Sequence, residues 1–337
     1  MKRPKNKEEY RQRLAESFTH VLEEKGLNWK KEWGGAGSQS PRNGVTKACY
    51  RGSNAFYLSL VSMVNGYDDP RWVTMVQIMD QKGTYHPKEK WHLKAGTEAT
   101  YVEYWFPFDV KSKRAMTWEE YAEALKNGRS EMDFVLSARY TAVFNATQVE
   151  GMPKLPIQEK QEISPDELLM KLSKNMGVPI LNDGGDGAFY SPSEDKIHLP
   201  VPESFYSEYA YNSTALHELA HATGHATRLN RSFVGLFATP EYAYEELIAE
   251  ITSALMGTDL STEAESEHVK NHKAYVQNWI SVIRNKPEML AKAIKEAQTA
   301  ACFLDWKAEL ITEQEYQKEV GMMKTIQVRE REIERER

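Results

Sequence analysis

The chain has 337 residues, of which 41% are hydrophobic and 27% are charged, which is typical of a globular protein long enough for two domains. It contains no apolar run near the ~20 residues that a membrane helix needs, and its charged N-terminus lacks the apolar segment of a signal peptide. The two cysteines, Cys49 and Cys302, lie in different halves, as expected for free thiols in a reducing compartment. We therefore expect a cytoplasmic protein with no membrane partner.

Charge is divided unevenly along the chain. Residues 1–150 contain 23 Lys and Arg against 19 Asp and Glu, whereas the remainder contains 20 against 30. A basic first half joined to an acidic second half fits a module that binds a polyanion, attached to a module with another role. The positive excess is small, so it permits nucleic-acid binding without requiring it.

The first 150 residues mix helical and strand patterns. Apolar residues recur at helical spacing in several stretches, of which Tyr10, Leu14 and Phe18 before Gly26 are the clearest. Alternating apolar residues predict strands. The predicted helices are 7–26, 55–64 and 117–127, the predicted strands are 98–105 and 140–145, and 70–78 is a short buried element. These patterns indicate a small α+β domain over 1–150, followed by a polar linker over 151–160.

The second half is predicted to be mostly helical with a small sheet. A helix over 164–175 precedes a hairpin formed by 187–190 and 195–199. The later helices are one that contains His217 and ends near Gly224, followed by 240–257, 263–285 and 287–306. The expected fold class is α+β with two domains, the second over 161–310, and with a charged helical tail over 311–337.

The strongest motif is His217-Glu218-Leu219-Ala220-His221. Residues four apart share one face of a helix, so both imidazoles can reach one ion. Two histidines at this spacing suit a tetrahedral divalent metal, most often Zn²⁺. Glu218 can take a proton from a water that the metal polarises, which makes it the candidate general base. The alternative is a helix with two structural histidines and a solvated glutamate.

A second helix offers the third ligand. Residues 240–257 carry helix signals at both ends, and within them Glu246 and Glu250 lie one turn apart on a face of small residues that would let another helix approach. We place Glu246 as the third ligand and Glu250 as the partner that orients a ligating histidine, with the exchange of these roles left open. Glu245 lies off this face and is expected to be exposed. The pattern resembles the gluzincin metallopeptidases, and it predicts a zinc-dependent enzyme.

His225 follows the motif by four residues. Gly224 is the usual kind of residue to end a helix, because glycine adopts the left-handed conformation there. His225 is therefore a candidate to support a ligand or to act as an alternative ligand, and an ordinary surface turn is an equal alternative.

Cations and aromatic residues are interleaved in the first half. Proteins that bind single strands use cations to follow the phosphates and aromatic rings to stack on bases. The candidate contact residues are Arg42, Lys47, Tyr50, Arg51, Arg71, Trp72, Lys88 and Lys90. The alternative is that the aromatic residues form the domain core and the lysines keep the surface soluble.

Several stretches together resemble ArdC-type antirestriction proteins. In the first half they are Arg42-Asn43-Gly44-x-x-Lys47-x-x-Tyr50-Arg51-Gly52-x-Asn54, Arg71-Trp72-x-Thr74-x-x-Gln77 and Lys88-Glu89-Lys90. In the second half they are Tyr190-x-Pro192-x-x-Asp195, the segment from His217 to Leu229, Tyr242-Ala243-x-Glu245-Glu246-Leu247-x-Ala249-Glu250 and Tyr275-x-x-x-Trp279.

The resemblance implies a single-stranded-DNA-binding N-terminal domain and a zincin-like metallopeptidase C-terminal domain. It adds Asn43 and Gln77 to the candidate DNA-binding residues. Members of the family are carried by plasmids, phages and integrated elements, and protect incoming DNA from restriction. Single-stranded DNA is then the expected partner, and a restriction protein or a DNA-bound host protein is a possible substrate class.

Two other functions are compatible with the sequence. In the first, proteolysis is the purpose and DNA only directs the peptidase to the proteins bound to it. In the second, the chain is a DNA-binding protein without catalysis, and the metal has a structural role. A catalytic site keeps one coordination position open, which favours the enzyme.

Overall fold

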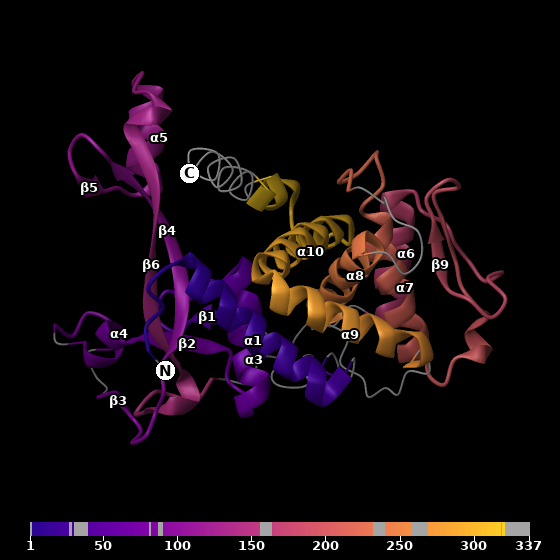
Figure 1. Ribbon diagram of the computed structural model, residues 1–337, viewed down its shortest axis with the longest axis horizontal. Helices are drawn as coiled ribbons and strands as arrows, with labels where there is room; N and C mark the ends of the chain where they lie inside the picture. Colours follow the sequence, from indigo (N-terminus) through magenta and orange to yellow (C-terminus); the bar gives the residue numbers. More distant parts are fainter. Residues whose placement is uncertain are drawn as a thin grey trace.

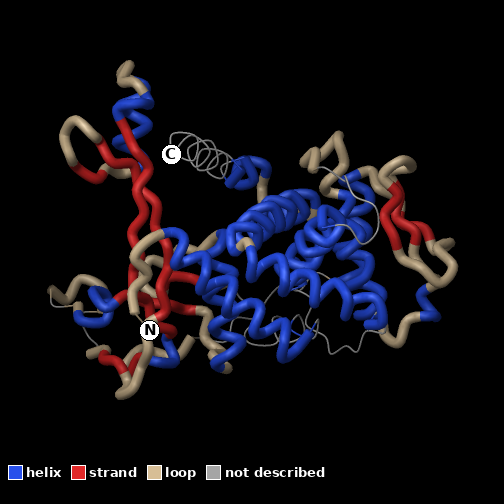
Figure 2. Tube along the Cα trace, in the orientation of Figure 1, coloured by secondary structure: helices blue, strands red, loops and turns tan. Residues whose placement is uncertain are grey.

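A computed structural model of the chain describes residues 2–26, 29, 40–80, 82–86, 90–155, 164–231, 240–257, 269–317 and 319–320. A sheet with a long two-stranded extension lies at one end of the molecule, and helices fill the middle and reach the other end (Figures 1 and 2). This is the predicted α+β class, with a mostly helical second half that also holds a small sheet. None of the described helices has the length and hydropathy that crossing a bilayer requires.

The larger sheet has five strands in the order β1-β2-β6-β4-β5. They are β1 (Arg42–Asn43), β2 (Arg71–Thr74), β4 (Thr100–Asp109), β5 (Arg114–Ala115) and β6 (Phe134–Asn145). Only the β1–β2 pair is parallel, and β4 pairs with β6 along its whole length. The outer part of β4 and β6 projects beyond the helical body as a ribbon, with α5 (Trp118–Lys126) at its end (Figure 1). A separate pair is formed by β3 (His92–Leu93) and β7 (Val149–Glu150).

Helices from both halves of the sequence share one core. They are α1 (Lys7–Lys25), α3 (Gly52–Asn65), α8 (Pro240–Gly257), α9 (Val269–Asn285) and α10 (Pro287–Lys307). Phe18 of α1, Ile248 of α8 and Trp279 of α9 are buried in this cluster. The two parts predicted as domains therefore meet through a continuous apolar interior. The linker predicted over 151–160 is described only as far as residue 155.

A second core supports the other end of the helical half. It joins α6 (Pro165–Met176), the strands β8 (Ile180–Leu181), β9 (Phe189–Ser191) and β10 (Lys196–His198), and α7 (Glu208–Ala222). Leu168, Ile197 and Leu216 are at most 1% exposed within it, and Phe303 of α10 joins them. β9 and β10 form the predicted antiparallel hairpin, and β8 pairs with the other side of β10.

Most of the predicted helices and strands are present. Where their observed ends differ from the predicted ones, local hydrogen bonds often set the boundary. Thr117 is the N-cap residue of α5, and Ser164 is the N-cap residue of α6. The element predicted over 70–78 divides into β2 and a short helix α4 (Met75–Met79), because Thr74 and Gln77 form a reciprocal capping box. β6 begins earlier than the predicted 140–145, because its outer part lies in the ribbon, where weak burial blurs the apolar alternation.

One carboxamide holds the free edge of β4. The Asn54 side chain donates to the Glu103 carbonyl (2.6 Å) and accepts from the Glu103 N–H (2.8 Å). The same Asn54 oxygen accepts from the Tyr10 hydroxyl (3.0 Å). Since Asn54 is on α3 and Tyr10 is on α1, this group ties both helices to the base of the ribbon.

Replacing Asn54 by Ala is expected to lower the free energy of unfolding by about 1–3 kcal/mol, because partly buried donors and acceptors lose their partners. Denaturant unfolding would measure the change. Asn65→Ala is the matched control, since its exposed carboxamide makes one bond, to the Val61 carbonyl (2.8 Å), and we expect little effect there. Equal losses in both variants would contradict the structural role of Asn54.

Candidate metal centre

α7 presents both motif histidines on one side. Ser207 caps its N-terminus by accepting from the Ala210 N–H (3.2 Å). Leu216 and Leu219 are at most 1% exposed in the second core, which fixes the rotation of the helix about its axis. His217 and His221 are thereby placed on the side that packs against α8.

α8 places Glu246 against these imidazoles. Its two carboxylate oxygens lie 3.4 Å from His217 Nε2 and 3.5 Å from His221 Nε2. The two Nε2 atoms are 3.2 Å apart. Ligand atoms of all three residues thus lie within 4.8 Å of one another, and no second such group of His, Cys, Asp or Glu occurs among the described residues. Among the candidates for a third ligand, Glu246 lies in this group with the two histidines, and it remains the predicted ligand.

Two further carboxylates lie behind the imidazoles. Glu250 is 3.7 Å from His217 Nδ1, where it was expected to help orient a histidine. Glu245 lies 3.4 Å from His221 Nδ1 and is only 8% exposed, so the expectation that it is exposed was wrong. Glu245 precedes Glu246 on α8 and still reaches α7, which is consistent with the burial of the small residues Ala249 and Ser253 on the neighbouring side of the helix.

Arg231 holds Glu245 in this position. Its guanidinium donates to both Glu245 oxygens (2.7 and 3.2 Å), to Thr223 Oγ1 (2.6 Å) and to the Ala220 carbonyl (2.8 Å). The last two acceptors belong to the C-terminal end of α7, so Arg231 joins α7 to α8 beside His221. Sequence reasoning missed Arg231 because a cation fourteen residues before its partner leaves no periodic signal.

Charge around the imidazoles favours their protonation. Burial works to lower the pKa of His217, but Glu250 and Glu246 outweigh it, so that the net pKa is raised from 6.5. Burial likewise opposes a proton on His221, yet Glu245 and Glu246 raise its pKa well above 6.5. Burial opposes ionisation of Glu246 too, but hydrogen bonds from both histidines hold its pKa far below 4.5. Glu218 is 7% exposed and lies close enough to interact electrostatically with both imidazoles.

His225 lies in the turn after α7 and belongs to another set of contacts. Its Nδ1 is within hydrogen-bonding distance of Thr227 Oγ1 (2.8 Å) and 4.0 Å from Asp195. Asp195 accepts from the Tyr190 hydroxyl (2.7 Å) and is paired with Arg228, which also donates to the Ala222 carbonyl (2.6 Å). These contacts fasten the β9–β10 hairpin to the end of α7.

Models of two protein families match the chain. Residues 8–144 match the N-terminal domain of the anti-restriction factor ArdC, and residues 167–296 match a zincin-like metallopeptidase domain. Two crystal structures of the ArdC protein from the R388 plasmid, metal-free and Mn(II)-bound, are 26% identical with a TM-score of 0.66. The metal-free one covers 90% of this chain and 98% of its own. The chain therefore has the two-domain architecture of ArdC, an ArdC-type N-terminal domain followed by a zincin-like metallopeptidase domain.

Longer relatives carry the same ArdC-like unit. Two proteins of Escherichia coli named DNA primase TraC are each 32% identical, over 87% and 93% of this chain. The chain spans only 19% and 29% of their lengths. An uncharacterised protein of Sinorhizobium fredii is 28% identical, over 88% of this chain and 90% of its own length. The zincin-like domain, together with the Mn(II)-bound relative, indicates that this centre takes a divalent metal.

Many of the ArdC-like residues expected to bind DNA have structural partners here. Arg71 is 6% exposed and pairs with Asp69 (2.6 Å), Trp72 is fully buried, and Gln77 is 7% exposed. Gln77 exchanges hydrogen bonds with Asn43 (3.0 and 3.3 Å). In this fold Arg71, Trp72 and Gln77 offer almost no surface to a nucleic acid.

The other candidates lie nearer the surface. Lys47 and Lys90 are exposed, although the Lys47 ammonium donates to the Gly44 carbonyl (2.7 Å). Arg42 and Tyr50 are half-buried. Arg51 forms an ion pair with Glu319. Lys88 lies outside the described residues.

Removing a ligand is expected to empty the centre. His217→Ala and Glu246→Ala should each retain only background metal on elemental analysis, because two remaining ligands bind a divalent ion weakly. Glu245→Ala should weaken metal binding by about 10–100-fold, since it only orients His221. His225→Ala is the matched control and should keep its metal. Metal loss in the control would bring His225 back as a ligand.

Metal affinity should fall on acidification, beginning above pH 6.5, because carboxylates raise the pKa of both histidines above that value in the metal-free site. The ion must displace these protons, so where both imidazoles are protonated the affinity should change by up to about a hundredfold per pH unit. Competition with a chelator between pH 8 and pH 5.5 would show this. An affinity that stays constant down to pH 6.5 would contradict the assignment.

Proposed function

We propose that this chain is an antirestriction protein of a mobile element, with a DNA-binding first half and a metal-dependent peptidase site in the second. The ArdC relative from the R388 plasmid is named as an antirestriction protein, and the family model of the first half carries the same description. The observation that carries the enzymatic part is the convergence of His217, His221 and Glu246 beside Glu218.

The donor set fits Zn²⁺. Ligand atoms placed about 2.0–2.1 Å from one tetrahedral zinc ion lie roughly 3.3 Å from each other. The two Nε2 atoms are 3.2 Å apart, and a different Glu246 oxygen lies near each of them, 3.4 Å from His217 Nε2 and 3.5 Å from His221 Nε2. Two imidazoles and one carboxylate are also the ligand set of many zinc peptidases, with the fourth position left for water. The bound ion would supply Lewis acidity to a water and to the carbonyl that is attacked.

The protein's own groups would carry the remaining steps. Glu218 would accept the proton of the attacking water and return it to the leaving amine, and its burial excludes competing solvent. Glu245 and Glu250 would hold the imidazole Nδ1 atoms, so that Nε2 of each ring faces the ion. β9 forms one edge of the small sheet, and an extended peptide could pair with that edge.

We further propose that the first half binds single-stranded DNA without sequence preference. Two relatives are named as DNA primases, which places those proteins on DNA. The protein substrate would then be a restriction protein or a host protein bound to the same DNA. We place this activity in the cytoplasm, which is consistent with Cys49 and Cys302 being free thiols.

Glu218→Gln separates catalysis from binding. The variant should keep its metal and its affinity for DNA, because Glu218 is not a ligand, and should lose peptide hydrolysis by about 10²–10⁴-fold. Protection of incoming DNA in cells would be measured with the same variant. Loss of protection supports a peptidase acting in antirestriction. Full protection by a variant without hydrolysis would show that proteolysis is not how the DNA is protected.

A further inference from the structure

We propose that one face of the β4–β6 ribbon, formed by Tyr104, Phe106 and Arg139, is the surface on which the bases of single-stranded DNA stack. This inference rests on the proposed DNA-binding function and specifies where that binding occurs. None of these three residues is among the contacts expected from the sequence motifs.

The strand register places the three side chains on the same face. Tyr104 pairs with Arg139 and Phe106 pairs with Ser137, and directly paired residues point to the same side of a sheet. The two rings are stacked with centroids 6.3 Å apart and planes 18° from parallel. The Arg139 guanidinium lies over both, 4.8 Å from the Phe106 centroid and 5.9 Å from that of Tyr104.

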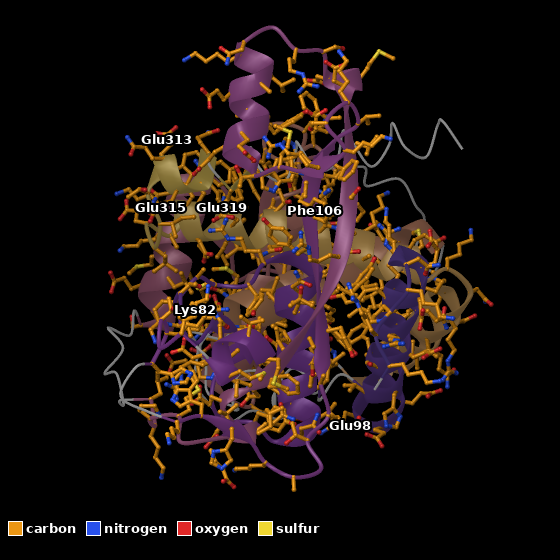
Figure 3. All side chains as sticks on the ribbon, turned by 90° about the vertical axis from the view of Figure 1, so that its left-hand side faces the viewer. Lys82, Glu98, Phe106, Glu313, Glu315 and Glu319 are labelled. Carbon is orange, nitrogen blue, oxygen red and sulfur yellow. The ribbon has the colours of Figure 1, made fainter. Side chains whose placement is uncertain are left out.

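The inner part of this face is covered and the outer part is not. Near the body, Val102 and Val143 are buried against Leu58 of α3 and Trp72 of β2. Farther out, Tyr104 is 50% exposed and Val135, which lies opposite Phe108, is 45% exposed. Figure 3 views the molecule from the end that carries the ribbon, with Phe106 labelled on it. The outer rings therefore contribute to a surface, in contrast to the buried Trp72.

Charge on this face complements a phosphate chain. The two carboxylates of β4, Glu103 and Asp109, alternate onto the opposite face. Each is already paired there, Glu103 with the Tyr140 hydroxyl (2.9 Å) and Asp109 with Arg129 (2.6 Å). Arg139 has no carboxylate partner within the described part of the chain, and its guanidinium is exposed above the rings.

A single strand fits this arrangement better than a duplex. Every unpaired base offers a face to an aromatic ring, whereas the bases of a duplex are stacked on one another and hide those faces. An unpaired guanidinium beside the rings can hold a phosphate at the same time. The combination predicts tolerance of sequence, because stacking on a ring and contact with a phosphate do not depend on which base is bound.

The test measures the affinity of the full chain for a fluorescent oligothymidylate by anisotropy, over a range of salt concentrations. Tyr104→Ala and Phe106→Ala should each weaken binding about tenfold and leave the salt dependence unchanged. Arg139→Ala should weaken binding and also lower the slope of log affinity against log salt by about one. Tyr104→Phe should bind like the wild type. Tyr206→Ala, an exposed tyrosine of the other half, is the matched control and should have no effect.

A second arm changes the DNA. Removing the bases from the oligonucleotide should lower the affinity of the wild type. The affinity of the Tyr104→Ala/Phe106→Ala double variant should fall much less. An equal loss in both proteins would mean that the substitutions act through folding, and would overturn the stacking surface. If all the variants bind DNA as tightly as the wild type, the stacking surface is overturned, although the chain still binds DNA. No binding by the wild type at low salt would remove the DNA-binding function together with this surface.

Discussion

The contact between α7 and α8 is the constraint on which the centre depends. A motif on one helix can bring two imidazoles together, but it cannot supply a third ligand at the right distance. The carboxylate that lies beside both imidazoles comes from α8, whose small residues Ala249 and Ser253 share the side of Glu246 and are buried. The Arg231 guanidinium fixes the approach by bonding to α7 carbonyl and hydroxyl oxygens and to Glu245 of α8. Three carboxylates then surround two imidazoles, a concentration of negative charge that a divalent cation compensates.

The first half of the chain contributes to this arrangement from a distance. The Trp279 indole of α9 donates to the Ala243 carbonyl (2.7 Å), close to the start of α8 and two residues before Glu245. α9 and α10 in turn pack against α1, which belongs to the first half by sequence. Asn54 joins the ribbon to α1 and α3, and these helices share a core with α8, which carries Glu246. The two halves are thus joined through one shared hydrophobic core.

Sequence reasoning succeeded where one local signal decides the structure. The helix ends at Gly26, Thr117 and Ser164 follow from caps, and the histidine pair follows from spacing alone. Glu246 was selected because a carboxylate among small residues is unusual on a helix face, and its carboxylate lies beside both imidazoles. The errors concern contacts between distant segments. Glu245 was expected to be exposed since nothing nearby in sequence shows that Arg231 would return to meet it. The burial of Trp72 and Arg71 depends on α3 and on the 151–155 segment, which reach them from far along the chain.

Residues that a chain shares with a family can be needed for the fold or for binding a ligand. In the first half of this chain, several of the shared residues have structural roles. Asn43 and Gln77 bond to each other, Arg71 bonds to Asp69, and Asn54 closes the edge of β4. Each contact is specific in geometry, so each position tolerates few other residues, whether or not DNA is present. A surface that stacks bases has looser requirements, because any planar ring will serve, and it leaves a weaker trace in a motif. The outer ribbon has this character: Tyr104 and Phe106 lie on one face of β4, Arg139 of β6 lies over both rings, and neither strand places a carboxylate on that face. The proposed stacking surface thus lies on the outer ribbon, at the end of the molecule away from α7 and α8 (Figure 1).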